Sequence, residues 1–294
     1  SRDLLRNSSE LIVDCGDGVR LLARHARPER AGTRTAQRLA VLLHGWEGSS
    51  EALYVLTLGQ RLLDSGFDVV RLNLRDHGDS HHLNEQIFHS CRIDEVVGAV
   101  QRLQSLHPQH ELNLVGFSLG GNFFLRVGTR ARTAGLEIAR IIALSPVLEP
   151  ANTLRALESG WALYRNYFIW KWRRSLRQKQ AAWPSLYDLD HVIRLNNLTD
   201  MTEQLACRYG GFPSLRDYLN GYAITGGALE ALTVPTRIIA AEDDPIIPAA
   251  DLDRLARPPA LEITRTKFGG HCGFYAGRGD SWFVREVART LGLP

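Results

Sequence analysis

The chain has 294 residues, of which 44% are hydrophobic and 23% are charged, and its formal net charge is +3. This is the composition of a globular protein with a substantial core. The small net charge argues against nucleic acid or an anionic membrane as the main partner. The four cysteines are far apart and form no C-x-x-C pair, which predicts reduced thiols rather than a disulfide framework or a zinc site.

The first segment, SRDLLRNSSE, is polar and charged, unlike a secretory signal. No apolar run approaches the roughly 20 residues that a helix needs to cross a bilayer. We therefore expect a cytoplasmic protein. Because the chain starts with serine rather than methionine, the sequence does not decide whether residues precede Ser1, and it does not give the oligomeric state.

Short apolar segments alternate with helical patterns along the chain. The segments ELIVDC and VRLLARHA flank the turn dipeptide Asp17-Gly18, which predicts an opening hairpin. A helix over 49–66 begins with two serines as capping candidates and ends at Gly66. Further strands are expected at 39–45, 68–74, 111–117, 139–146, 236–244 and 261–270, and further helices at 93–108, after Ser118 and at 280–292.

This alternation predicts an α/β fold with a mainly parallel eight-stranded sheet and helices on both faces. Residues 149–232 interrupt the pattern, because they contain no convincing buried strand and are rich in aromatic and basic residues. Long insertions of this kind usually have a functional role. We expect a helical cap at 149–232, inserted between a first core segment, 1–148, and a second, 233–294.

The stretch GFSLGG follows the strand expected at 111–117 and begins the next helix. It places Ser118 in a G-x-S-x-G motif between a strand and a helix, the context that is typical of a nucleophilic serine. Such a sharp turn strains the backbone of its corner residue, and small neighbours let strand and helix approach each other. The alternative, an ordinary glycine-rich turn, is disfavoured by this context.

A serine hydroxyl needs a base to take its proton. Among ten histidines His271 is the best placed, because FGGHCGF follows the last expected strand and its glycines let the loop approach the serine. The imidazole in turn needs an acid, and Glu242, Asp243 and Asp244 end the preceding strand. Spacing alone does not choose among them, and we favour Asp244. A surface-loop histidine and a solvated acidic turn are the alternatives.

A tetrahedral intermediate also needs hydrogen-bond donors for its oxyanion. The amide of Leu119, directly after the serine, is one candidate. The loop LLHGWEGSS is expected to supply the other, because Gly45 lets it turn toward the serine, and this points to the amide of Trp46. A strand-ending turn with a helix cap at Ser49 or Ser50 is compatible with the same residues.

Seven stretches over almost the whole chain form one pattern: HGWEGSS (44–50), FHS (88–90), GFSLGGN (116–122), LYDLDHVIR (186–194), GGFPSLRDYL (210–219), VPTRIIAAEDDPIIP (234–248) and GGHCGF (269–274). This pattern resembles the α/β-hydrolases, and in detail the YheT-like branch, which is related to the ABHD1/ABHD3-type hydrolases. FHSC and RDHGDS depart from the Y-H-S-G and R-G-C-S-G that this branch usually has. The departures concern the substrate's surroundings rather than the triad.

The resemblance implies a Ser118–Asp244–His271 triad, with the acid four residues before the last proline of D-P-x-x-P. It also implies hydrolysis of carboxylic esters with short to medium acyl chains through an acyl-enzyme. The substrate would be a small-molecule or lipid ester, and the reaction requires no metal or organic cofactor. The alternatives are acyl transfer to an alcohol, or hydrolysis of lipids, including phospholipids, at a membrane surface. A non-catalytic binding protein is disfavoured, because every triad position carries a competent residue.

Three further features have a plain and a functional interpretation. The segment RDHGDSHH (75–82) has the residue types of a metal site, but we favour a polar loop. A stripe along one predicted helix is expected to pack on the core or over an acyl pocket, or to dock transiently on an anionic membrane. The stripe consists of Trp161, Tyr164, Phe168 and Trp172. We expect Cys272 to fill its loop rather than to react.

Overall fold

The computed structural model describes residues 2–28, 37–274 and 281–293. Within these residues eight strands form one sheet in the order β1-β2-β4-β3-β5-β6-β7-β8. The strands are β1 (Ser8–Asp14), β2 (Arg20–Ala26), β3 (Arg38–Leu43), β4 (Asp68–Leu72), β5 (Glu111–Phe117), β6 (Ile138–Leu144), β7 (Thr236–Ala241) and β8 (Leu261–Thr266). The pairs β1–β2 and β2–β4 are antiparallel and the others are parallel. The predicted sheet is confirmed.

Burial along the strands explains why their sequences differ. In β3, in the middle of the sheet, every residue from Leu39 to Leu43 is buried, because helices cover both faces. A central parallel strand therefore appears as a continuous apolar run. The edge strand β8 contains no fully buried residue, and each of its side chains is exposed or half-buried.

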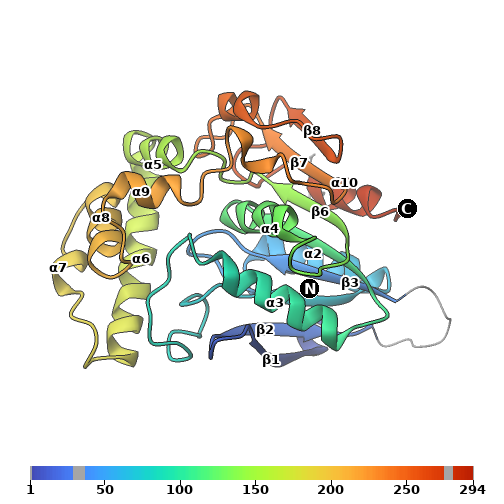
Figure 1. Cartoon of the computed structure of the whole chain (residues 1–294), viewed down its shortest axis with the longest axis horizontal. Coiled ribbons are helices and arrows are strands. Elements are labelled where there is room, and N and C mark those ends of the chain that lie inside the picture. The colour runs from blue at the N-terminus through green and yellow to red at the C-terminus, as the bar shows by residue number, and fades with distance from the viewer. Residues whose placement is uncertain (1, 29–36, 275–280, 294) are drawn as a thin grey trace.

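Two hydrophobic clusters hold helices on opposite faces of the sheet. The buried side chains of α3 (Ile93–Leu106) and α4 (Leu119–Arg130) belong to one cluster, and Figure 1 shows both helices in front of the sheet. Those of α1 (Arg2–Arg6), α2 (Leu53–Asp64) and α10 (Trp282–Thr290) belong to the other. This is the two-sided packing that the strand–helix alternation predicts.

The start of α2 differs from the prediction. The residue before this helix is Ala52, and no side chain caps it. Ser49 Oγ accepts instead from the amide of Glu51 (3.2 Å), and the amide of Ser50 donates to Asn73 Oδ1 (2.7 Å). The serines are therefore fixed in the preceding loop, three residues before helical geometry begins. At the other end Gly66 has φ +85°, as expected of a residue that terminates a helix.

The segment for which the sequence predicts a cap contains helices and no described strand. These are α5 (Pro150–Ser159), α6 (Ala162–Ala182), α7 (Asp190–Ile193), α8 (Leu198–Arg208), α9 (Leu215–Asn220) and the 3₁₀ turn η1 (Gly227–Leu229). Figure 1 shows α5 to α9 together beside one end of the sheet, with α6 as the longest of them. Among the described residues, no helix is both long and apolar enough to span a membrane.

A buried ion pair ties α6 to the core. Lys179 Nζ donates to Asp76 Oδ1 (2.9 Å) and to the carbonyl groups of Asn84 (2.7 Å) and Gln86 (3.1 Å). Trp183, just after the helix, donates through Nε1 to the carbonyl of His81 (2.9 Å). Removing one partner of a buried pair typically costs about 3–5 kcal/mol. The C-terminal half of α6 is therefore firmly held against the loop that follows β4.

Candidate active site

Ser118 lies at the corner where β5 turns into α4, at φ 51° and ψ −116°. This left-handed conformation is strained for a residue with a side chain. At Gly116 and Gly120, two residues before and after the serine, a residue with a side chain would not fit. A Cβ on Gly116 would lie 2.4 Å from the carbonyl oxygen of Gly120, and one on Gly120 would lie 2.4 Å from that of Leu43. The G-x-S-x-G spacing is thus a steric requirement of the turn.

The structure brings Ser118, His271 and Asp244 into one hydrogen-bonded chain. Ser118 Oγ lies 3.0 Å from His271 Nε2, and His271 Nδ1 lies 2.9 Å from Asp244 Oδ2. Because Asp244 can only accept when ionised, it fixes the proton of a neutral imidazole on Nδ1 and leaves Nε2 to accept from the serine. The amides of Ile246 and Ile247 donate to Asp244 Oδ1 (2.8 and 3.0 Å), which holds the carboxylate in place.

The neighbouring acidic residues have other positions. Asp243 Oδ1 accepts from the amides of Gly269 (2.9 Å) and Gly270 (2.8 Å), so it shapes the loop that carries His271. Glu242 is exposed. Of the three acidic residues that spacing alone does not separate, Asp244 is the one in contact with the imidazole.

The loop that follows β3 lies directly against the serine. A Cβ on Gly45 would be 3.1 Å from that of Ser118, which is a tight contact, so glycine at this position favours the close approach. Trp46 and Leu119 line the same cavity as Ser118. Neither of their amides has a hydrogen-bond partner within the residues that the structure describes. Both amides are therefore available as donors, as the predicted oxyanion site requires.

Two buried neutral histidines hold this loop. His44 donates through Nδ1 to the carbonyl of Gly45 (2.7 Å) and accepts at Nε2 from the amide of Leu74 (3.2 Å). His77 donates through Nδ1 to the carbonyl of Arg75 (2.7 Å) and accepts at Nε2 from the amide of Glu47 (3.1 Å). Burial lowers the pKa of His44 well below its usual value and that of His77 to about 4. Both rings can therefore keep accepting at Nε2 at neutral pH.

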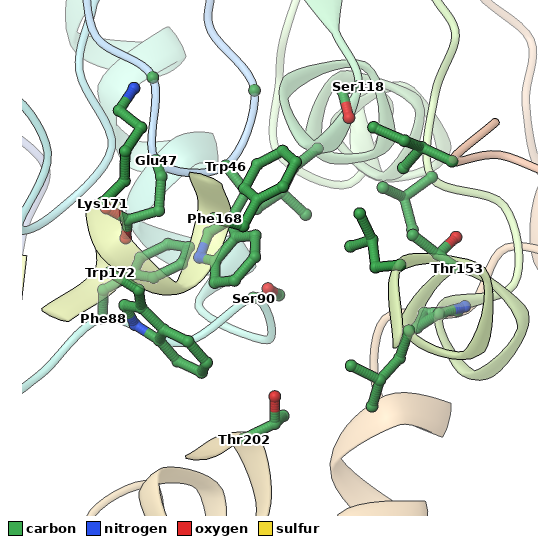
Figure 2. Close-up of a pocket in the computed structure, with 18 of the residues that line it drawn as sticks. Trp46, Glu47, Phe88, Ser90, Ser118, Thr153, Phe168, Lys171, Trp172 and Thr202 are labelled. Atoms are coloured by element: carbon green, nitrogen blue, oxygen red, sulfur yellow. The ribbon is translucent and has the colours of Figure 1, made fainter. Parts of the chain in front are cut away.

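Glu47 is a component of the site that the sequence did not reveal. It follows Trp46 at φ 54° and is 9% exposed. Burial raises the pKa of its carboxyl to about 8, with Lys171 opposing and Asp76 reinforcing the shift. Figure 2 shows Glu47 beside Lys171 at one wall of the cavity. A glutamate in a loop, between Trp46 and Gly48, gives no sequence signal of burial, and only the fold reveals it.

Ser118 borders a cavity of about 470 Å³ between the core and the helices α5, α6 and α8. On one wall the ring of Trp46 stacks on Phe168 (centroids 5.3 Å apart) and meets Trp172 edge-on (4.8 Å). Figure 2 shows these rings on one side of the cavity and Thr202 at the end opposite Ser118. Most of the remaining wall is apolar: Phe88, Leu119, Val147, Pro150, Leu154, Leu157, Leu205, Ala206, Leu219 and Ile246.

The asparagine of GFSLGGN joins the core to the segment beyond β6. Asn122 Nδ2 donates to the carbonyl groups of Val147 (2.9 Å) and Tyr222 (2.8 Å). Its Oδ1 accepts from Arg126 (3.0 Å), which also donates to the carbonyl of Ser90 in the FHS motif (2.8 Å). Two motifs that are distant in sequence therefore belong to one buried network behind the cavity.

The segment RDHGDSHH forms a polar loop with structural partners. Asp76 pairs with Lys179, His77 supports the loop after β3, and His81 Nε2 lies 2.9 Å from Ser175 Oγ in α6. Within the described part of the chain, the group of residues that could hold a metal ion contains none of them. This agrees with the plain interpretation of the segment.

The aromatic stripe of α6 is divided between two environments. Phe168 and Trp172 pack against Trp46 over the cavity, as expected. Trp161 and Tyr164 instead remain 74% and 38% exposed, because the helix begins beyond the edge of the core.

The thiol beside His271 is hydrogen-bonded to the backbone and buried. Cys272 Sγ donates to the carbonyl of Leu144 (3.7 Å). Burial raises the pKa of the thiol, and the charge of Asp244 adds to the shift. Because the thiolate is the nucleophilic form, the geometry agrees with a packing role for Cys272.

Comparisons with known proteins agree with this fold. The family described as having the alpha/beta hydrolase fold matches residues 40–182. The putative esterase YheT of Escherichia coli (strain K12) is 26% identical over 248 residues, which are 81% of this chain and 70% of that protein. Human phospholipase ABHD3 is 21% identical over 250 residues, again 81% of this chain but only 58% of that protein.

An esterase from Pyrococcus furiosus has a similar structure, with a TM-score of 0.63 and 16% sequence identity over 99% of this chain and 92% of that one. The sheet order, the turn at Ser118 and these matches show that the chain has the α/β-hydrolase fold. Its sequence is similar to those of YheT and ABHD3, as its motifs predicted.

Glu47 makes stability depend on pH. Between pH 4.5 and about 8 the folded state keeps a proton on this carboxyl that the unfolded chain releases. Stability therefore falls as pH rises through that range, by up to about 1.4 kcal/mol per pH unit. We expect Glu47→Gln to remove this contribution, so that the variant gains stability relative to the wild type from pH 5 to 8 and no further above it.

Urea unfolding of both proteins over a pH series measures the difference. Glu242→Gln, which removes one charge from an exposed position, controls for the change in net charge. Parallel pH profiles for the wild type and Glu47→Gln would contradict the assignment of a buried, protonated carboxyl at position 47.

Proposed function

We propose that this protein is a serine hydrolase that cleaves carboxylic esters with short to medium acyl chains through an acyl-enzyme intermediate. The observation that carries the proposal is the hydrogen-bonded chain Ser118–His271–Asp244, with Oγ to Nε2 at 3.0 Å and Nδ1 to Oδ2 at 2.9 Å, beside an apolar cavity. A serine that is activated in this way is a nucleophile for acyl transfer.

In the first half of the proposed reaction, His271 takes the proton of Ser118 as Oγ attacks the ester carbonyl. Asp244 stabilises the resulting imidazolium without taking its proton. The amides of Trp46 and Leu119 hold the oxyanion of the tetrahedral intermediate, and removal of one such donor typically costs about 10²–10³-fold in rate. His271 then protonates the leaving alcohol. In the second half a water, deprotonated by the same imidazole, attacks the acyl-serine and releases the acid.

The composition and the volume of the cavity support an apolar acyl chain of short to medium length. Its wall is made mainly of aliphatic and aromatic side chains, and its volume of about 470 Å³ lies in the range of small-molecule sites. The two curated relatives described above are named as an esterase and a phospholipase, and both names describe cleavage of an ester bond. An apolar acyl group fits the apolar part of this wall, whereas a charged one would lose its hydration against it.

Replacement of the nucleophile tests the mechanism directly. We expect Ser118→Ala to lower the rate of aryl-ester hydrolysis by about 10⁴-fold or more, because the acyl-enzyme can no longer form. A fluorophosphonate probe should label the wild type at Ser118 and leave the variant unlabelled. Ser105→Ala, at an exposed serine of α3, is the control. Equal hydrolysis by wild type and Ser118→Ala would remove the proposed nucleophile.

The length of the acyl pocket is testable at its far end. Thr202 lines the cavity, at the end opposite Ser118 (Figure 2). We expect Thr202→Phe to shift the optimum of an aryl-ester series to shorter chains, and to lower kcat/KM for the longest good substrate by about 10-fold or more. Gln204→Phe, on the exposed side of the same helix, should leave the optimum unchanged. An unchanged optimum in Thr202→Phe would place the acyl chain elsewhere.

A lipid surface as the source of substrate is the second candidate, and the exposed face of α6 favours it. Leu163, Tyr167 and Trp170 follow helical spacing and are 75%, 50% and 58% exposed. Tyr167 also lines the cavity of Ser118, so the exposed apolar side chains continue from the cavity onto the surface. Contiguous exposed apolar side chains mark interaction sites, membrane surfaces among them, and contact with a bilayer would present lipid esters to the cavity.

Vesicle sedimentation tests this candidate. We expect the wild type to bind vesicles of phosphatidylcholine and phosphatidylserine, and Leu163→Glu with Trp170→Glu to weaken binding about 10-fold or more, because apolar burial is lost. Leu106→Glu, at a 43% exposed leucine of α3, is the matched control. The absence of vesicle binding by the wild type would leave the soluble ester as the proposed substrate.

A further inference from the structure

Three histidines surround one aspartate at the edge of the sheet opposite Ser118. His25 lies in β2, Asp68 is the first residue of β4, His107 follows α3, and His110 precedes β5. His25 and His107 are only 8% and 7% exposed. Ser118 follows the carboxyl end of β5, whereas this cluster lies at the amino ends of β4 and β5. It is therefore separate from the proposed catalytic site.

The facing atoms have the spacing of metal ligands. Asp68 Oδ2 lies 3.4 Å from His25 Nε2, 3.9 Å from His107 Nδ1 and 3.6 Å from His110 Nε2. The ligand atoms of His25, Asp68 and His107 all lie within 4.8 Å of one another. A tetrahedral zinc ion with bonds of about 2.0–2.1 Å places its ligands roughly 3.3 Å apart. Small side-chain adjustments would therefore close the group around one ion.

The contacts between the histidines and Asp68 are long for hydrogen bonds, at 3.4 to 3.9 Å. His25 Nε2 is buried and has no well-aligned hydrogen-bond partner among the described residues. The rings of His25 and His107 meet edge to face, with centroids 5.0 Å apart, and those of His107 and His110 do so at 4.9 Å. A buried ring nitrogen without a well-aligned partner is typical of a site that holds a water or an ion.

We propose that His25, Asp68 and His107 bind a divalent transition-metal ion of the Zn²⁺ type, with His110 placed to supply a fourth ligand. Closed sites with four protein ligands are structural, and this one would clamp β2 and β4 to the turn between α3 and β5. Arg27 Nε lies 3.8 Å from the same oxygen of Asp68 and is 73% exposed. Its side chain can therefore swing into solvent when the ion binds.

The test uses the untagged full chain after dialysis against a chelator. Calorimetric titration with Zn²⁺ is expected to give one ion per chain and a rise in melting temperature, because the ion binds only the folded state. Asp68→Asn and His107→Gln are expected to weaken binding about 10-fold or more each. His82→Gln, at an exposed histidine outside the cluster, should bind as the wild type does.

Cobalt provides a readout that does not depend on the variants. Co²⁺ bound to the wild type is expected to show the intense visible absorption of tetrahedral coordination, and an excess of Zn²⁺ should remove it. No binding of Zn²⁺ by the wild type, a weak six-coordinate Co²⁺ spectrum, or equal affinity in His107→Gln and His82→Gln would each overturn the proposal. Circular dichroism shows whether each variant is folded. If a variant does not fold, the Co²⁺ absorption spectrum of the wild type remains the test of the proposal.

Discussion

The close approach of three backbone segments at Ser118 is the constraint on which the rest of the site depends. The end of β3, the end of β5 and the start of α4 are so near one another that a single added carbon at Gly116 or Gly120 would lie 2.4 Å from a carbonyl oxygen. This compression keeps Ser118 at a positive φ and directs its hydroxyl toward His271. It also places the first amide of α4 beside the loop after β3, so that nucleophile and candidate oxyanion donors derive from one packing arrangement.

The polar groups around that corner show how a loop can be rigid without regular secondary structure. His44 and His77 each use one ring nitrogen as donor and the other as acceptor, and burial keeps both rings neutral at physiological pH. Asn73 completes the set by accepting from the amide of Ser50 (2.7 Å). A preorganised loop costs no reorganisation when charge develops in the transition state. The buried Glu47 tolerates this environment because it stays protonated until about pH 8.

The sequence was sufficient wherever one local pattern carried the information. Central strands such as β3 are buried on both faces and so appear as apolar runs, and the G-x-S-x-G spacing follows from sterics at the turn. The sequence was insufficient where residues from distant segments determine the hydrogen bonds or the burial of a side chain. Ser50 looks like a helix cap, but Asn73 holds its amide in the loop, and α2 begins later. Glu47 looks like a solvated loop residue, but it is buried, with Lys171 of α6 beside it. His25, Asp68 and His107 are each unremarkable alone, since three separate segments of chain have to fold before their atoms converge.

The anchoring of α6 has a consequence for how a bulky molecule reaches Ser118. Lys179 and Trp183 pin the C-terminal end of this helix to the core, while Trp161 and Leu163 at its other end are 74% and 75% exposed. Phe168 and Trp172 lie between these two ends and pack against Trp46. Any widening of the cavity beside Trp46 therefore has to move α6 against its anchored end. The buried Lys179–Asp76 pair then helps to set the size of molecule that can reach the serine.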